Sequence, residues 1–254
     1  MKRIYYFTVF ILFTLVAFVV FVLVWLFTVL FDRNRAMIHR YSRFWAKTIY
    51  RLSPWWKVKV EGLENIEKGK SYIILANHQA MLDIPLIYYV PLDFKWVSKK
   101  EVYKIPVFGW VLWMHGDVAI ERGGAASAKK MITKADALLR RGVSIMMFPE
   151  GTRTKDGRVH KFMPGAFLLA KKSKVDLLPV VINGNYDAFG ADGRSGLQAP
   201  HTFTVRILPS LHSSEYEDMR FDEISRKMED TIREEHVKLA PEYYIDNTES
   251  EDKK

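Results

Sequence analysis

The sequence predicts an α/β fold, with a mixed central sheet flanked by helices, preceded by an N-terminal membrane helix and a basic amphipathic interfacial helix. Two observations support this prediction. From residue 57 onward, short apolar segments alternate with helix-like segments, as they do in α/β domains. The first 56 residues instead contain a long uncharged run and then a basic segment. Because neither an internal repeat nor a low-complexity linker interrupts the chain, we expect three parts: an anchor and interfacial helix over 1–56, one α/β catalytic domain over 57–240, and an acidic, disordered tail over 241–254.

The composition limits the classes of protein to which the chain can belong. Of its 254 residues, 49% are apolar, which is enough for a sizeable core. Cysteine is absent, which excludes disulfides, thiolate metal sites and a cysteine nucleophile. The net charge is +9, but residues 213–254 carry 14 acidic and 7 basic side chains, so the preceding residues carry +16. This positive charge suits an anionic partner, either nucleic acid or a phospholipid surface.

The first segment, Ile4–Phe31, contains no charged residue, no glycine and no proline over 28 positions. As an α-helix it would be about 42 Å long, which exceeds the hydrocarbon core of about 30 Å. A cleaved signal peptide normally has an apolar region of about 7 to 15 residues followed by small residues. Here large apolar residues continue to Phe31, so a membrane helix is the better interpretation. Whether this helix spans the bilayer or re-enters it stays open.

The next segment, residues 33–56, is basic and has helical periodicity. Its apolar side chains recur every three or four residues, and its basic side chains fall mostly on other faces: the first set is Ile38, Tyr41, Trp45, Ile49 and Leu52, the second Arg35, Arg40, Arg43, Lys47 and Arg51. This pattern predicts an interfacial helix with its charges toward anionic lipid. The alternative is an ordinary surface helix packed on its own domain. By the positive-inside rule, the following domain is expected on the cytoplasmic face of the membrane, with the phospholipid bilayer and no nucleic acid as partner.

Beyond residue 57, six apolar segments are predicted as strands: Tyr72–Ala76, Phe94–Val97, Val118–Glu121, Val143–Phe148, Leu178–Ile182 and Phe203–Leu208. Helices are expected between most of them. The clearest, Ala125–Arg141, ends at Gly142, a residue typical of helix C-termini. A further helix, Phe221–Leu239, is charged and amphipathic, and the acidic tail follows it.

The stretch ILANHQAMLDIP (Ile74–Pro85) places a histidine and an aspartate five positions apart, directly after an apolar strand. On a continuous helix, this spacing would separate the two side chains by about 140°. They can meet if His78 lies in the turn after the strand and Asp83 in the first turn of a helix. The carboxylate would then orient the imidazole, which could act as a general base. Because no cysteine and no G-x-S-x-G motif is present, the natural nucleophile is a hydroxyl of the substrate. Taken alone, the spacing also fits a purely structural polar corner.

Two further stretches follow predicted strands and supply groups suited to phosphate. FPEGTRT (Phe148–Thr154) combines glycine, hydroxyl and guanidinium groups, which together can hold a phosphate. GDVAIER (Gly116–Arg122) ends in a second arginine. Each stretch alone could be a solvated turn, but with the histidine and the aspartate they form an ordered series.

In this series the chain resembles the glycerolipid acyltransferase family, and within it the bacterial 1-acyl-sn-glycerol-3-phosphate (lysophosphatidate) acyltransferases. The resemblance covers roughly Val60–Ile207 and rests on four motifs: N-H-x4-D at Asn77, His78 and Asp83, G-x5-R at Gly116 and Arg122, F-P-E-G-T-R at Phe148–Arg153, and an apolar block around a proline at Leu177–Val181. One position departs from the family pattern, because Met163 stands where the family often has lysine. This departure puts one charge contact to the phosphate or the acyl donor in doubt.

The resemblance implies a role for each motif. His78 would be the general base on the free hydroxyl of lysophosphatidate, oriented by Asp83, and no acyl-enzyme would form. Arg122 and Arg153 would bind the phosphate of the acceptor. Further substrate-binding candidates are Gly151 and Thr152, which would approach the same phosphate, and Glu150, which would brace the loop. The acyl donor would be an acyl-carrier-protein or coenzyme A thioester, a substrate and not a cofactor, and no cofactor or metal is expected.

Three other interpretations differ in the sequence features that they require. A zinc hydrolase would need a ligand spacing such as H-E-x-x-H, which the seven histidines do not provide. A non-catalytic lipid-recruitment protein would use the anchor and the arginines but would not need a histidine–aspartate pair. A sister acyltransferase that acts on another lysolipid would carry the same motifs. The sequence does not distinguish this last alternative, the acyl donor, the acyl-chain length or the oligomeric state.

Overall fold

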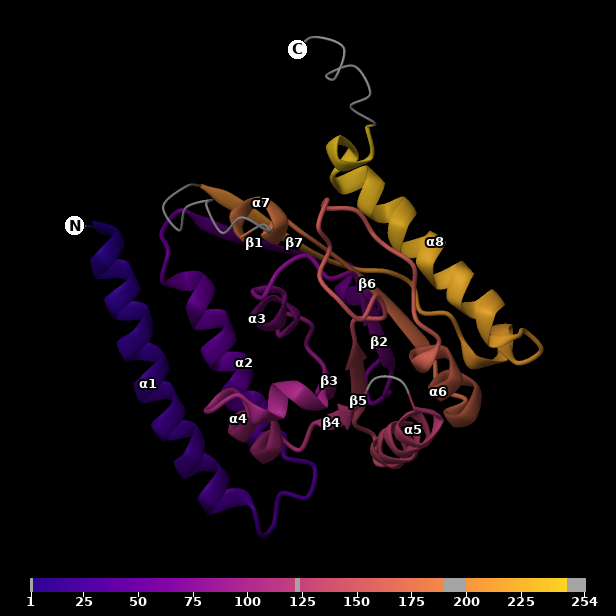
Figure 1. Ribbon diagram of the computed structural model, residues 1–254, viewed down its shortest axis with the longest axis horizontal. Helices are drawn as coiled ribbons and strands as arrows, with labels where there is room; N and C mark the ends of the chain where they lie inside the picture. The colour runs from indigo at the N-terminus through magenta and orange to yellow at the C-terminus, as the bar shows by residue number, and fades with distance from the viewer. Residues whose placement is uncertain (1, 122–123, 190–199, 246–254) are drawn as a thin grey trace.

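A seven-stranded sheet forms the centre of the computed structural model, which describes residues 2–121, 124–189 and 200–245 (Figure 1). The strands are β1 (Trp56–Glu61), β2 (Ile73–Ala76), β3 (Phe94–Lys99), β4 (Val118–Ile120), β5 (Ser144–Met147), β6 (Leu177–Asn183) and β7 (His201–Ile207). The α-helices are α1 (Lys2–Thr28), α2 (Ala36–Arg51), α3 (Asp83–Ile87), α4 (Phe108–His115), α5 (Ala125–Leu139), α6 (Gly165–Ser173), α7 (Asn185–Phe189) and α8 (Phe221–Leu239). Short 3₁₀ helices are η1 (Leu63–Asn65), η2 (Lys100–Lys104), η3 (Ser213–Tyr216) and η4 (Pro241–Tyr244).

The strand order is β1-β7-β6-β2-β5-β3-β4, and the sheet is mixed as predicted. The five strands β6, β2, β5, β3 and β4 run parallel to one another. The remaining two, β7 and β1, are parallel to each other, and β7 is antiparallel to β6. In the register at the centre of the sheet, Ile74 pairs with Met146 on one side and with Leu178 on the other. The carboxyl ends of the five parallel strands therefore lie along one edge of the sheet.

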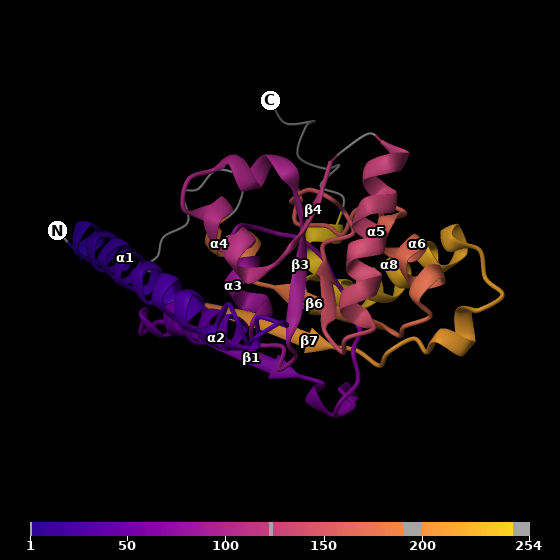
Figure 2. The ribbon, with the colours of Figure 1, turned by 90° about the horizontal axis from the view of Figure 1, so that it is seen from below.

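Helices cover both faces of the sheet (Figure 2). On one face, α5, α6 and α8 pack on a core that includes Ile73 and Leu75 of β2. On the other face, α2 and α3 pack on a core that includes Ile74 and Ala76. Because alternate side chains of a strand point to opposite faces, a strand buried on both faces is apolar at every position. This explains why β2 is a continuous apolar run in the sequence.

The six predicted strands and the two predicted helices are confirmed, with boundaries that differ by one or two residues. The first strand, β1, was not among the predicted strands. Its signal was present, since Lys57 and Lys59 are exposed and alternate with the half-buried Val58 and Val60. Such alternation is typical of a strand that buries one face. In β1 the two lysines mask an otherwise apolar segment.

Helix α1 is long and apolar enough to cross a membrane, with a mean hydropathy of 2.9 over Ile11–Thr28. One side of it packs on the rest of the chain. The hydroxyl of Tyr41 in α2 donates a hydrogen bond to the carbonyl of Ala17 at 2.8 Å. The rings of Trp25 and Trp113, in α1 and α4, lie 5.4 Å apart. Figures 1 and 2 both show α1 alongside α2.

Helix α2 packs on the α/β domain through part of the face that was predicted to meet lipid. Ile38 and Ile49 belong to the predicted apolar stripe, and both are buried within the protein. On this face the helix matches the alternative of a surface helix packed on its own domain. The apolar side chains of α2 that remain exposed are Met37 and Phe44. The physical reason is that a helix beside a sheet gains more from burying its apolar stripe in the core than from exposing it.

The C-terminal segment is ordered further than expected. The acidic tail was predicted to be disordered from residue 241, but Pro241–Tyr244 forms η4. The hydroxyl of Tyr244 accepts a hydrogen bond from the backbone N–H of Val159 at 3.0 Å, and the hydroxyl of Tyr243 donates one to Asp187. These aromatic contacts outweigh the acidic composition of the segment. Residues 246–254 of the predicted tail lie outside the described residues.

Candidate active site

Three loops meet at the carboxyl ends of the neighbouring parallel strands β6, β2 and β5. The loop after β2 begins with Asn77, whose amide is buried. Its Nδ2 donates to the carbonyl of Ile182 and its Oδ1 accepts from the N–H of the same residue, both at 2.9 Å. This amide extends the pairing with β6 by one side chain where the backbone turns away. The asparagine of the first motif therefore fixes the start of the loop that carries His78.

His78 and Asp83 meet as predicted. The imidazole Nδ1 lies 2.7 Å from Oδ2 of Asp83, which begins α3. The imidazole ring stacks flat on the ring of Phe148, with centroids 4.0 Å apart and planes 4° apart. The His78 side chain is 16% exposed, whereas that of Asp83 is fully buried. The aspartate and the phenylalanine thus hold the imidazole from its Nδ1 edge and from one face.

The surroundings of Asp83 provide several donors and no competing acceptor among the described residues. Besides the imidazole, Oδ2 accepts from the backbone N–H groups of Gln79 and Ala80, and Oδ1 accepts from Nδ2 of Asn185 at 2.7 Å. An ionised carboxylate only accepts hydrogen bonds, so this arrangement matches its charged form. The Nδ1 of His78 must then carry the proton. Its Nε2 has no hydrogen-bond partner among the described residues and is left to accept a proton, which is the geometry of a general base.

Glu150 accepts hydrogen bonds from the loop that carries His78. Its Oε1 accepts the backbone N–H of His78 at 2.8 Å, and its Oε2 accepts that of His160 at 3.0 Å. Burial raises the pKa of this carboxyl to about 7, although the two backbone hydrogen bonds act in the opposite direction. Both carboxyl oxygens therefore bind the protein's own backbone. Glu150 ties the loop after β5 to the loop that carries the histidine.

The other residues of the third motif continue past His78. Gly151 has φ of +68°, a left-handed conformation that favours glycine, and a Cβ there would also lie 2.7 Å from Sδ of the exposed Met163 side chain. Thr152 and Arg153 are exposed. The next residue, Thr154, donates its backbone N–H to the carbonyl of His78 at 2.8 Å. The exposed guanidinium of Arg153 has no ion pair with the described residues, so it is available to an anionic ligand.

Arg122, the arginine of the second motif, lies outside the described residues. The strand before it, β4, ends at Ile120 on the same edge of the sheet as β2 and β5. Gly116 ends α4 with φ of +83°, a left-handed conformation that favours glycine. The second motif therefore has a structural role at its glycine, and its arginine remains a prediction.

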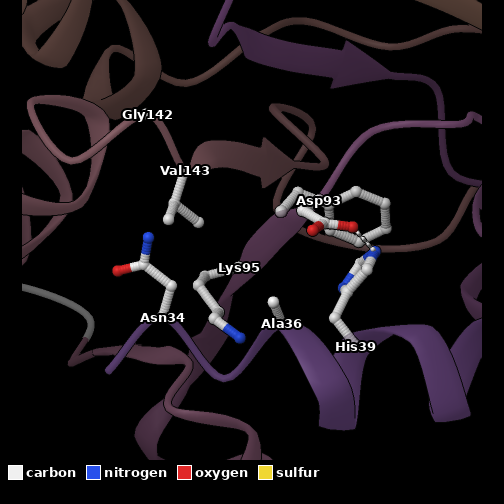
Figure 3. Close-up of a pocket in the computed structure, with 8 residues that line it drawn as sticks. Asn34, Ala36, His39, Asp93, Lys95, Gly142 and Val143 are labelled. Carbon is white, nitrogen blue, oxygen red and sulfur yellow. Dashed lines mark ion pairs between the residues drawn. The ribbon is translucent and has the colours of Figure 1, made fainter. Parts of the chain in front are cut away.

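A second cluster of buried polar groups lies at the opposite edge of the sheet. A small cavity of about 70 Å³ there is lined by Asn34, Ala36, His39, Asp93, Phe94, Lys95, Gly142 and Val143 (Figure 3). Burial lowers the pKa of Lys95 to about 8. Asp93 and Val143 precede β3 and β5, so this cavity faces away from the carboxyl ends of the strands. Its volume is too small for a lipid.

One group of three side chains in the described part of the chain could by its spacing hold a metal ion. Ligand atoms of Glu67, Asp176 and His212 lie within 4.8 Å of one another. The ammonium of Lys70 already pairs with Asp176 at 2.6 Å and with Glu67 at 2.8 Å. The ammonium of Lys70 therefore already occupies both carboxylates and would compete with a metal ion for them.

Sequence reasoning missed Asn185 and Tyr50, which lie behind Asp83. Asn185 is in the segment NGNY, which begins with the last residue of β6, and a polar residue at the end of a buried strand was a signal for the site. Tyr50 gave no such signal, because it lies in the basic segment assigned to the membrane. Its hydroxyl is within 3.2 Å of Oδ1 of Asn185.

Comparison with known proteins agrees with the geometry of the site. Residues 57–183, half of the chain, match the family model described as Acyltransferase. This segment contains the histidine, the aspartate and all four motifs. The chain belongs to the acyltransferase family.

The relatives specify which acyltransferases it is similar to. The 1-acyl-sn-glycerol-3-phosphate acyltransferase of Pseudomonas aeruginosa is 30% identical over 82% of this chain and 80% of its own length. The chloroplastic 1-acyl-sn-glycerol-3-phosphate acyltransferase LPAT1 of Arabidopsis thaliana is 34% identical over 74% of this chain. The crystal structure of the 1-acyl-sn-glycerophosphate acyltransferase PlsC from Thermotoga maritima superimposes with a TM-score of 0.75 at 26% identity, covering 94% of this chain and 96% of the other. The chain spans only 46% to 64% of the length of three plant and algal relatives.

Proposed function

We propose that this protein transfers a fatty acyl group from an acyl thioester to the free hydroxyl of 1-acyl-sn-glycerol-3-phosphate. The product is phosphatidic acid, an intermediate of phospholipid biosynthesis. The observation that carries this proposal is the His78–Asp83 pair, whose imidazole is partly exposed and whose Nε2 has no hydrogen-bond partner among the described residues. The motifs around the pair and the relatives with this activity support the choice of substrate.

The reaction follows from the geometry of the pair. Nε2 of His78 accepts the proton of the substrate hydroxyl as the oxygen attacks the thioester carbonyl. The buried carboxylate of Asp83 stabilises the imidazolium that forms. When the tetrahedral intermediate collapses, the C–S bond breaks, and the imidazolium returns the proton to the departing thiolate. The oxygen–acyl bond forms directly, so no group on the enzyme needs to carry the acyl chain.

The phosphate of the acceptor would bind beside the histidine. Arg153 follows the loop that Glu150 braces, and its exposed guanidinium can make a bidentate contact with a phosphate. Gly151 and Thr152 would supply backbone and hydroxyl donors, and Arg122 a second guanidinium. Met163, exposed and adjacent to Gly151, supplies apolar surface where a lysine would supply charge.

The membrane would supply the acceptor and receive the product. Helix α1 would hold the enzyme in the bilayer, with the catalytic domain on the cytoplasmic face. Exposed apolar side chains of α1 and α2, among them Phe27, Met37 and Phe44, would contact lipid. Basic residues of α2 would contact anionic headgroups, each contributing about 1 kcal/mol near the surface.

The test is acyl transfer by the purified full-length protein in vesicles. A panel of lysolipids that share an acyl chain and differ in headgroup is assayed with acyl-carrier-protein and coenzyme A thioesters. We expect lysophosphatidate to be the best acceptor, and the donor with the higher kcat/KM identifies the thioester. A clear preference for a lysolipid without a phosphomonoester would identify a sister acyltransferase. Absence of thioester consumption with every acceptor would contradict an enzymatic role.

A further inference from the structure

The catalytic carboxylate is held from behind by a residue that no motif contains. Asp83 is fully buried, and the oxygen that faces away from His78 accepts a hydrogen bond from Nδ2 of Asn185 at 2.7 Å. Asn185 is itself fully buried, and it begins α7 after β6. It is the only described side chain that donates to this oxygen. A buried carboxylate depends on such donors to keep its charge and its orientation.

The amide of Asn185 is in turn oriented by Tyr50. Because Nδ2 faces the carboxylate, Oδ1 must accept, and the hydroxyl of Tyr50 lies 3.2 Å from it. A flipped amide would place its oxygen against Asp83. The single proton of this hydroxyl is shared with a second acceptor, the carbonyl of Leu82, the residue before Asp83, which lies 2.8 Å from the hydroxyl oxygen. Burial raises the pKa of Tyr50 well above its usual range, so the hydroxyl remains a donor.

Tyr50 reaches this position from α2, the helix that follows the membrane anchor. Its ring is enclosed by aromatic side chains, with Phe203 of β7 at 4.9 Å and Tyr89 at 5.9 Å between centroids, both edge to face. Asn185 and Tyr50 are separated by 135 residues in the chain. The last turn of α2 is therefore fixed to the loop of the catalytic pair by packing and by hydrogen bonds.

We propose that Asn185 and Tyr50 are positioning residues, which form a buried hydrogen-bonded chain from helix α2 through Asp83 to the imidazole of His78. This inference rests on the proposed function, since it assumes that His78 is the base. Neither residue contacts substrate. Tyr50 orients the amide, the amide holds the carboxylate, and the carboxylate holds Nδ1 of the imidazole. Helix α2 thus contributes the side chain of Tyr50 to the support of the catalytic pair, in addition to the proposed contact with the membrane.

Removal of the amide donor has a defined effect on protonation. Without the hydrogen bond from Asn185, the carboxylate is less well stabilised, so the histidine–aspartate pair binds a proton more tightly. The acidic limb of the kcat/KM profile should therefore move to higher pH. For one hydrogen bond to a charged group, we expect a move of about one pH unit. A residue that only supported the fold would lower the amount of active enzyme without moving this limb.

The experiment is a double-mutant cycle on the full-length protein in vesicles. Asn185→Leu should lower kcat by about 10- to 100-fold with little change in either KM, and Tyr50→Phe by about 10-fold, with a smaller move of the acidic limb in the same direction. The double variant should lose less than the product of the two single losses, because both act on one carboxylate. Tyr89→Phe is the matched control: its ring packs on that of Tyr50, its hydroxyl has no hydrogen bond to the described residues, and its kinetics should be unchanged.

A second measurement separates this inference from the choice of substrate. The pH dependence of His78 carbethoxylation, followed on the His78 peptide by mass spectrometry, reports protonation of the imidazole without any acyl transfer. The midpoint should be higher in Asn185→Leu than in the unchanged protein. Multiplicative losses in the cycle, or unchanged limbs and midpoints in folded variants, would overturn the inference. If the midpoint moves but no lysolipid is acylated, the chain of hydrogen bonds stands and the proposed reaction fails.

Discussion

Two histidine–aspartate pairs in this molecule have almost the same hydrogen-bond length and different surroundings. His78 Nδ1 lies 2.7 Å from Asp83, and His115 Nδ1 lies 2.6 Å from Asp117. His115 is almost fully buried, and its second nitrogen lies 3.2 Å from Nδ1 of His39. In the first pair the second nitrogen has no partner in the described part of the chain, and the side chain is 16% exposed.

A histidine–aspartate hydrogen bond by itself therefore does not define a catalytic site. A general base needs a second nitrogen that a substrate can reach. In the His115 pair both ring nitrogens are satisfied within the protein, and Asp117 also accepts the backbone N–H of Trp96 at 2.9 Å. Burial lowers the pKa of His115, although the contact with Asp117 acts in the opposite direction. The first pair therefore has the geometry that the proposed catalysis requires, whereas the second has the geometry of a structural contact.

Alanine substitutions of His78 and of His115, made one at a time, should give the largest contrast between loss of activity and loss of stability. His78→Ala should lower kcat by about 10²- to 10⁴-fold while the melting temperature stays close to that of the unchanged protein. His115→Ala should lower the free energy of unfolding by about 1–3 kcal/mol, because it leaves buried groups unpaired. The kcat of its folded fraction should stay within about twofold. Turnover and thermal unfolding of both variants provide the test, and an active, folded His78→Ala enzyme would make the first pair structural as well.

The aspartates should differ in the same way. Asp83→Asn removes the acceptor that selects the tautomer of His78, so the loss of kcat should be nearly as large as for His78→Ala. Asp117→Asn should mainly reduce stability. If urea unfolding curves and turnover numbers instead change in parallel for the two variants, the distinction between the pairs is wrong.

Substitutions of arginines of the second and third motifs and of Arg43 in α2 should give a smaller contrast. Arg153→Lys keeps the charge but loses the bidentate geometry, so the KM for lysophosphatidate should rise about tenfold and more than the KM for the donor. Arg122→Lys should act in the same direction. Arg43 of α2 pairs with Asp93, which lines the small cavity, at 3.3 Å, and Arg43→Lys should leave both KM values unchanged. Equal changes in the two KM values for Arg153→Lys would argue against phosphate binding.

Exposed and buried apolar residues of α2 test access to lipid. Met37→Ser with Phe44→Ser should reduce acylation of long-chain lysophosphatidate in vesicles a few fold and affect a short-chain, soluble acceptor much less. Ile49→Ser should reduce activity with both acceptors, because Ile49 is buried in the protein. Paired assays with the two acceptors make the measurement. A similar loss with both acceptors in the surface variant would mean that this surface supports the fold.

The smallest expected effect is the pH dependence of stability caused by the buried histidines. Burial lowers the pKa of His115 and of His39 below the usual value of 6.5. A group with a lowered folded-state pKa contributes stability above its unfolded pKa and loses it as the pH falls. The melting temperature should therefore decrease as the pH is lowered from about 7.5 to 5, and His115→Gln should weaken this decrease. A decrease of the same size in the variant would remove His115 from the explanation.

The helices, most of the strands and the meeting of His78 with Asp83 could be predicted from the amino-acid sequence. Apolar runs such as Tyr72–Ala76 and the glycine stop after Ala125–Arg141 reflect local steric and solvation preferences, which act within a few residues. The five-residue spacing of His78 and Asp83 is short enough for one turn to bring them together. The third motif could be predicted for a different reason. Its polar groups follow a predicted strand, and the carboxyl ends of parallel strands lie along one edge of the sheet.

The segments far along the chain that hydrogen-bond to this pair became visible in the three-dimensional fold alone. Asn185 follows Asp83 by 102 residues and Tyr50 precedes Asn185 by 135, and no periodicity in the sequence indicates which buried hydroxyl or amide will face a given carboxylate. The pairing of β1 with β7 and the burial of Ile49 also depend on how the whole chain closes around the sheet. Similarly, the sequence places the His78–Asp83 and His115–Asp117 pairs near strands. Packing alone shows that Nε2 of His78 lacks a partner among the described residues, whereas Nε2 of His115 contacts His39. Long-range burial and hydrogen bonding are properties of the assembled core, and they select among partners that local sequence leaves equivalent.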